Sequence, residues 1–153
     1  MAIQGALPLD HATVFPNGAF VVGEVSAVED FDAAKAAREA GRSADTQARD
    51  KASGKRLWQV RVIDADELAR KGQVEVVVKI AGDHQPMPPA HAQGVPFRPV
   101  EFENLTATPY IDESRNRPRI AWSFRAAGMH APGKGAPRAA AGQKPPVGDG
   151  KAA

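Results

Sequence analysis

The sequence predicts an all-β fold in a single domain. Two observations support this prediction: five segments have the alternation or the β-branched content of strands, and only residues 31–40 resemble a helix. A chain of 153 residues has room for one domain of ordinary size with a tail, and not for two. We therefore expect one β-domain over residues 1–128, followed by a tail over 129–153.

The first two strands are predicted over residues 19–28 and 56–64. The first is rich in β-branched residues, and Gly23 inside it indicates a bulge or a sharp bend. The second alternates, which places Trp58, Val60 and Val62 on one face and Leu57, Gln59 and Arg61 on the other.

The remaining three strands are predicted over residues 73–80, 100–111 and 119–126. The third and fifth alternate throughout, whereas the fourth shifts its phase at Asn104-Leu105, as a bulge would. The predicted inward residues are Val74, Val76, Val78 and Ile80 of the third strand and Ile120, Trp122, Phe124 and Ala126 of the fifth. Both tryptophans, Trp58 and Trp122, are thus expected in the core.

Three segments between and after the strands lack strand character. Residues 29–55 are charged and poor in large apolar side chains, which predicts a mobile excursion with a short helix capped by Asp30 or Asp32. Residues 81–99 contain five prolines, which disfavours any regular element. Residues 129–153 are rich in Gly, Pro, Ala and Lys, which predicts a flexible, disordered tail.

The order of three strands, a non-strand segment and two further strands is that of an OB-fold, a five-stranded Greek-key barrel. Residues 29–55 then form a long loop between the first and second strands. The helix that usually separates the third and fourth strands is replaced by the Pro-rich segment, so an open antiparallel sheet or a small sandwich is the alternative.

Composition excludes several classes of protein. The formal charge is +2, and the tail holds four basic residues against one acidic residue, which leaves 16 basic against 17 acidic residues in 1–128. The folded part is therefore not strongly basic, and any contact with nucleic acid must use a local patch. Cysteine is absent, no apolar run approaches the ~20 residues of a membrane helix, and the N-terminus lacks the pattern of a signal peptide. We expect a cytoplasmic protein that does not contact a membrane.

An OB-like barrel binds through its second and third strands and the loops between strands one and two and between strands four and five. Cations on these elements suit a phosphate backbone, and an exposed aromatic ring there suits a base. The alternative for the arginine cluster is a solvated turn, because Asp112 and Glu113 adjoin it. The candidate nucleic-acid-binding residues are Arg115, Arg117, Arg119, Arg125, Arg61, Gln59, Lys79 and Tyr110.

The sequence shows no sign of catalysis. The four histidines lack the spacing of a metal site, and no nucleophile elbow or Gly-rich phosphate loop follows a strand. We therefore expect no enzymatic activity, no cofactor, no metal and no small-molecule substrate.

Several motifs resemble one protein family. They are the opening MAIQGALP, VFPNGAFVVG over 14–23, LWQVRVIDAD over 57–66, and PFRPVEFENLT from Pro96 on through Tyr110 to Ala121. Over residues 1–132 the chain is similar to the plasmid replication, integration and excision activators of actinomycete integrative and conjugative elements. The resemblance implies an accessory activator of the replication, integration and excision of a mobile element.

Two modes of action are open for such an activator. It binds DNA directly, single-stranded or in a replication intermediate, or it docks an element-encoded replication initiator, recombinase or regulator. The near-neutral charge of residues 1–128 favours protein docking, and the expected barrel favours DNA.

Overall fold

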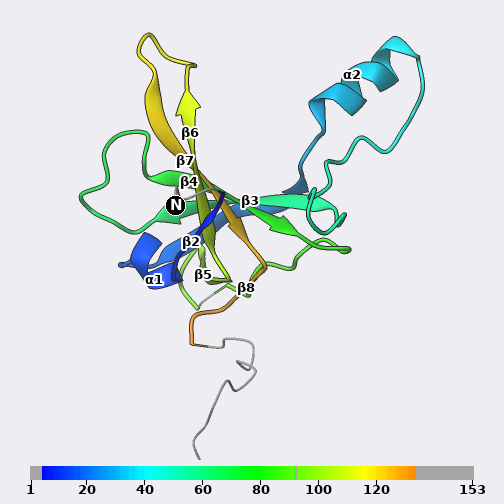
Figure 1. Ribbon diagram of the computed structural model, residues 1–153. Coiled ribbons are helices and arrows are strands. Elements are labelled where there is room, and N and C mark those ends of the chain that lie inside the picture. Colours follow the sequence, from blue (N-terminus) through cyan, green and yellow to red (C-terminus); the bar gives the residue numbers. More distant parts are fainter. Residues whose placement is uncertain (1–4, 92, 134–153) are drawn as a thin grey trace, which may run out of the picture.

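The computed structural model describes residues 5–91 and 93–133 and is built around one curled β-sheet (Figure 1). All-β character is therefore confirmed. The elements in chain order are β1 (Leu7–Pro8), α1 (His11–Val14), β2 (Ala19–Ala27), α2 (Phe31–Glu39), β3 (Leu57–Asp64), β4 (Glu75–Ala81), β5 (Arg98–Glu103), β6 (Thr106–Asp112), β7 (Arg119–Ala126) and β8 (Gly128–His130).

The strands lie in the order β1-β6-β7-β4-β3-β2-β5-β8. Neighbours are antiparallel except β4 and β7, which run parallel over three residue pairs, Val78–Ile80 against Phe124–Ala126. Strands β5 and β6 lie near opposite ends of this order, yet Asn104 and Leu105 alone separate them in the chain. A connection this short requires the sheet to curl until its two ends approach one another.

The five predicted strands are all present, with small changes at their ends. The fourth is divided into β5 and β6 at Asn104, whose φ of 49° interrupts the extended backbone where the sequence shifts its phase. The bulge predicted at Gly23 is also present: the β2–β3 register shifts between Val22 and Ser26, and Gly23 has a φ of 75°. With β1 and β8, the sheet counts eight strands where five were predicted.

The core lies on the concave side of the sheet. The predicted inward residues Val60, Val62, Val78 and Ile80 are buried there, joined by a group from the N-terminal segment and the β5–β6 region. That group includes Phe15, Val21, Val25, Val100, Phe102 and Leu105. Trp58 packs half-buried against this cluster, and its indole Nε1 donates to the carbonyl of Gly82 at 3.0 Å.

The prediction that Val74, Ile120 and Trp122 face the core is wrong: they are 40%, 73% and 47% exposed. The alternation of β7 gave the correct face, since Phe124 and Ala126 on that face do meet the core. The strand, however, continues past the core into a protruding β6–β7 hairpin, which rises at the upper left in Figure 1. Alternation identifies a face but not how far along a strand the core extends.

Residues 29–55 form a second protrusion, which we call the arm (Figure 1, upper right). It contains helix α2, whose N-cap Asp30 accepts a hydrogen bond from the Ala33 N–H, as one of the two predicted caps would. The chain returns to the sheet at Ala48, which lies between Val28 and Leu57. The Ala48 N–H donates to the Val28 carbonyl, and the Ala48 carbonyl accepts from the Leu57 N–H. The mobility proposed for the arm stays a prediction.

The predicted tail begins later than expected. Met129 and His130 lie in β8, which pairs with β5, and Met129 packs against the core. Most of the remaining tail, residues 134–153, lies outside the described residues.

Candidate nucleic-acid interface

Three of the predicted site residues lie side by side on the convex face of the sheet. Gln59 of β3 pairs with Lys79 of β4, and Lys79 pairs with Arg125 of β7. Residues directly opposite one another on neighbouring strands project to the same face. Gln59, Lys79 and Arg125 therefore form one transverse row, which Ser26 of β2 and Thr106 of β6 extend at its two ends.

Arg61 lies on the same face, two residues along β3 from Gln59. Its Nε donates to Oε1 of Glu75 on β4, and its Nη2 donates to Oε2 of the same carboxylate, both at 2.8 Å. These hydrogen bonds lower the pKa of the Glu75 carboxyl below its ordinary value. Arg61 is therefore already paired with an anion in a bidentate geometry.

Arg125 is also paired with an anion. Its Nη1 lies 2.6 Å from Oδ1 of Asp50, which belongs to the turn on the return limb of the arm. Hydrogen bonds from the Ser53 hydroxyl and N–H, and then Arg125, lower the pKa of Asp50. The row on the convex face is thus joined to the arm by an ion pair between residues 75 positions apart.

The remaining candidates lie on the β6–β7 hairpin. Arg119 donates through Nε to Oδ2 of Asp112, its cross-strand partner, at 3.1 Å. Tyr110 is 51% exposed and lies on the same face as Arg119, because Tyr110 pairs with Ala121, two residues farther along β7. This face continues the convex face of the sheet.

Arg115 and Arg117 lie in the turn between β6 and β7, and both are exposed. Within residues 5–91 and 93–133, neither they nor Lys79 approaches a carboxylate within 4 Å. Three of the six predicted cations are therefore available without breaking an ion pair inside the described chain. The structure brings the candidates to one face but neutralises half of their charge.

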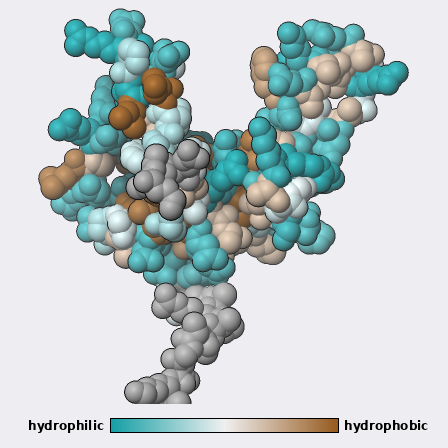
Figure 2. All heavy atoms as spheres, in the orientation of Figure 1, coloured by the Kyte–Doolittle hydropathy of each residue, from teal (hydrophilic) through white to brown (hydrophobic). Residues whose placement is uncertain are grey.

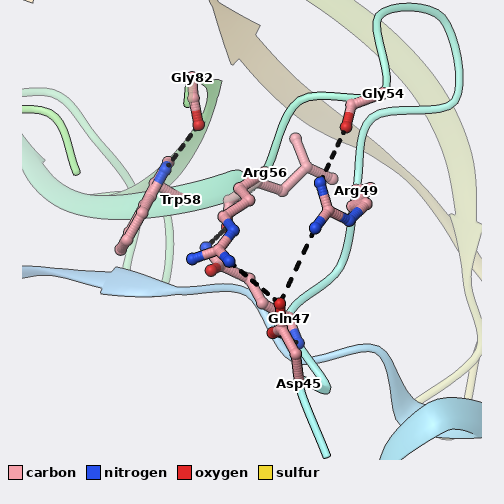
Figure 3. Close-up of polar contacts among 8 residues, drawn as sticks. Asp45, Gln47, Arg49, Gly54, Arg56, Trp58 and Gly82 are labelled. Carbon is pink, nitrogen blue, oxygen red and sulfur yellow. Dashed lines mark hydrogen bonds and ion pairs between the residues drawn. The ribbon is translucent and has the colours of Figure 1, made fainter. Parts of the chain in front are cut away.

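The root of the arm is fixed to β3 by a polar network (Figure 3). Asp45 Oδ2 lies 3.2 Å from Nη2 of Arg56 and 3.8 Å from Nη2 of Arg49. Gln47 Nε2 donates to the Leu57 carbonyl at 2.9 Å. These contacts tie the root of the arm to the start of β3, and the arm and the hairpin rise from the same side of the molecule (Figure 1).

A cleft of about 990 Å³ opens between β4 and β7 on the hairpin side of their three paired positions. Its lining includes Lys79, Tyr110, Arg119 and Arg125, four of the predicted site residues. Trp122, which the sequence assigned to the core, also lines it.

Sequence reasoning missed three residues that shape this region. Trp122 was assigned to the core and not to the binding site, because its inward phase was taken for burial. Glu75 lies opposite Ile63 and contacts Arg61 diagonally, which follows only from the β3–β4 register. Asp50 carried no local signal, since its partner Arg125 is distant in the sequence.

No family model, curated protein or solved structure matches this chain. The family resemblance therefore depends on the quoted motifs. In the described part of the chain, no helix has the length and apolar character needed to cross a membrane. The same residues contain no group of three or more His, Asp or Glu side chains placed to hold a metal ion.

Proposed function

We propose that this protein is a non-enzymatic, cytoplasmic OB-like module that binds single-stranded DNA or a replication intermediate on its convex face. Through this binding it would act as an accessory activator of mobile-element replication, integration and excision. The observation that carries the DNA-binding proposal is the row of Gln59, Lys79 and Arg125 across β3, β4 and β7.

Strand pairing supports the OB-like assignment. Strands β2, β3 and β4 follow one another as antiparallel neighbours, and β5 returns to lie beside β2, which is a Greek-key order. If β5 and β6 are counted as one bent strand, the five strands pair in a ring that includes one parallel contact, β4 with β7. The arm and the hairpin then occupy the positions of the two loops that flank the binding face of an OB-fold.

The ion pairs on this face do not prevent phosphate binding. The arginines of all three pairs stay about half exposed, and ion pairs at the surface are worth about 0–1 kcal/mol. A phosphate can therefore replace the carboxylate partners of Arg61, Arg119 and Arg125. Their presence predicts modest affinity with a strong dependence on salt.

Fluorescence anisotropy with labelled single-stranded and duplex oligonucleotides at two salt concentrations tests the proposal. We expect dissociation constants at or below about 10⁻⁵ M for single strands at low salt, within the range of non-specific binders. Binding weaker than about 10⁻⁴ M at low salt contradicts the proposal, since even non-specific binders reach that affinity.

A triple substitution, Arg115→Ala, Arg117→Ala and Arg119→Ala, tests the role of the hairpin. Fewer phosphate contacts should weaken binding about equally for all sequences, by about tenfold or more at low salt, and flatten the salt dependence. The matched control removes the same charge from the arm: Lys35→Ala, Arg38→Ala and Arg42→Ala. Equal losses in both triple variants would show that the hairpin arginines have no role beyond that of the arm cations.

Docking of an element-encoded replication initiator, recombinase or regulator is the second candidate function. Exposed apolar side chains on the hairpin favour this function: Ile111 is 67% exposed and Ile120 is 73% exposed. Figure 2 shows hydrophobic residues, in brown, on the hairpin. If the triple variant of the hairpin loses activation of the element while keeping its DNA affinity, the hairpin serves a protein partner.

A further inference from the structure

The cleft between β4 and β7 has an unusual origin in the strand pairing. Strand β4 pairs with β3 along its whole length, and β7 pairs with β6 from Arg119 to Arg125. The second edge of β4 therefore faces the second edge of β7. These two edges form hydrogen-bonded pairs only between Val78–Ile80 and Phe124–Ala126. Beyond these pairs, residues 75–77 and 119–123 diverge around the cleft.

The diverging edges carry backbone groups without a partner strand. Along an extended strand, successive N–H and C=O groups point alternately to its two sides, so about half of those in residues 75–77 and 119–123 face the cleft. Within the described chain, no turn or loop backbone hydrogen bond involves these residues. The cleft therefore offers donors and acceptors at fixed positions to a polar ligand.

The side chains around the cleft come from both faces of the sheet. Val76, Ile120, Trp122 and Phe124 project from the concave face and supply apolar and aromatic surface. Residues of the opposite phase, among them Tyr110, also line it. Residues of both faces therefore border the cleft, together with Ala6, Val14 and Phe15 of the N-terminal segment.

Cations lie at both ends of the cleft on the convex face. Arg119 is on the hairpin side, and Lys79 and Arg125 lie at the paired end. The acidic groups in the lining are Asp64 and Glu75, and Glu75 is neutralised by Arg61. Lys79 has no carboxylate within 4 Å in the described chain, whereas Arg119 and Arg125 would have to exchange Asp112 and Asp50 for a ligand anion. With that exchange, a ligand with a negative charge on either side of an uncharged, planar group matches this distribution.

We propose that this cleft is a binding site for an unpaired nucleobase of a strand that runs along the convex face. This inference rests on the proposed function and names the part of the ligand that the cleft takes. A base has apolar faces that stack on aromatic side chains and polar edges that match unpaired backbone groups, and its flanking phosphates would reach Arg119 and Lys79.

A base fits this cleft better than an inserted peptide strand does. Strands are usually five to six residues long, whereas an inserted strand could pair with both edges of the cleft only over residues 75–77 of β4. A paired and stacked base is not available for insertion, so the site selects single strands over duplex. This selection does not depend on the base sequence.

The test compares Trp122→Ala with Ile111→Ala in the full-length chain. Ile111 is a matched control, because it is an exposed apolar residue of the same hairpin face but does not line the cleft. Anisotropy is measured with an oligothymidylate and with an abasic strand of the same length and charge. We expect Trp122→Ala to weaken oligothymidylate binding about 5- to 100-fold, the range of a lost base stack, and Ile111→Ala to change it less than about twofold.

The abasic strand supplies the discriminating readout. It should bind the wild type more weakly than oligothymidylate does, and Trp122→Ala should not weaken it further; Trp122→Phe should restore part of the oligothymidylate affinity. If the wild type binds both strands equally, or if both alanine variants behave alike, the base site is wrong while DNA binding stands. If the wild type binds neither strand, the proposed function fails and the base site with it.

Discussion

His11 links the short helix α1 to the core through a neutral imidazole. Its Nδ1 accepts a hydrogen bond from the Phe102 N–H at 3.2 Å, and its ring lies 5.2 Å from that of Phe15 and 5.9 Å from that of Phe102. Burial lowers the pKa of His11 below its usual 6.5, with Glu101 opposing this shift and His130 adding to it. A protonated ring could no longer accept the Phe102 hydrogen bond.

This arrangement predicts a loss of stability in mild acid. Because the folded state holds the pKa of His11 below its unfolded value, the unfolded state binds the proton more readily, and the free energy of unfolding falls as pH drops through and below 6.5. Urea unfolding at pH 7.5, 6.5 and 5.5 measures the effect. His11→Gln should flatten this part of the pH dependence, whereas the same change at exposed His84 should leave it intact; equal profiles would contradict the prediction.

At the residue scale, the sequence predicts faces better than it predicts partners. Alternation correctly assigned Val60, Val62, Val78 and Ile80 to the core, because a period of two is a local property of a strand. The ion pairs of Arg61 and Arg125 escaped prediction because they depend on strand register and on a turn far away in the sequence. Whether the candidate site residues bind DNA stays a prediction.

At the element scale, the arm and β7 are joined by the Asp50–Arg125 pair. The carboxylate of Asp50 occupies the place beside Arg125 that a phosphate would take, and Ser53 holds it in position through Oδ2. On the proposed function, a bound strand would therefore compete with the arm for the same guanidinium group.

Asp50→Asn should strengthen single-strand binding by about 1.4- to 5-fold, the equivalent of an exposed ion pair of about 0.2–1 kcal/mol. The matched control is Asp45→Asn, which changes the net charge equally but lies in the network at the root of the arm. Anisotropy at low salt compares the two variants. An equal gain in both would assign the effect to net charge and not to competition at Arg125.

Strong local signals predicted the elements, and weak ones were missed. Five strands, the break at Asn104, the bulge at Gly23 and the Asp30 cap each leave a mark within a few residues. Strands β1 and β8 have two and three residues, too few for a periodic pattern, and they exist because β6 and β5 offer edges. The extent of the hairpin beyond the core also has no local signal.

At the scale of the whole molecule, Asn104 is the corner that brings the two ends of the sheet together. Its φ of 49° lies in the left-handed region, which Asn tolerates better than most residues and Gly tolerates freely. Leu105, which follows it, is buried in the core. The backbone turn and the burial of Leu105 must therefore form together.

Substitutions at Asn104 test this role in the global stability. Asn104→Ala should lower the free energy of unfolding by about 1 kcal/mol, because alanine tolerates the left-handed region poorly. Asn104→Gly should be close to neutral, since the freedom it gains at this φ is offset by the greater entropy of the unfolded chain. Chemical denaturation compares the two variants; an alanine variant as stable as the wild type would contradict the prediction.

The ring-like order of the strands has a consequence for synthesis on the ribosome. The meander of β2, β3 and β4 emerges first, with the outer edges of β2 and β4 both unoccupied until β5 and β7 have been translated. Pairings between such distant segments form slowly. The nascent chain therefore passes through a stage in which two open β-edges are exposed at once, and a message truncated before residue 98 would release a polypeptide prone to edge-to-edge association.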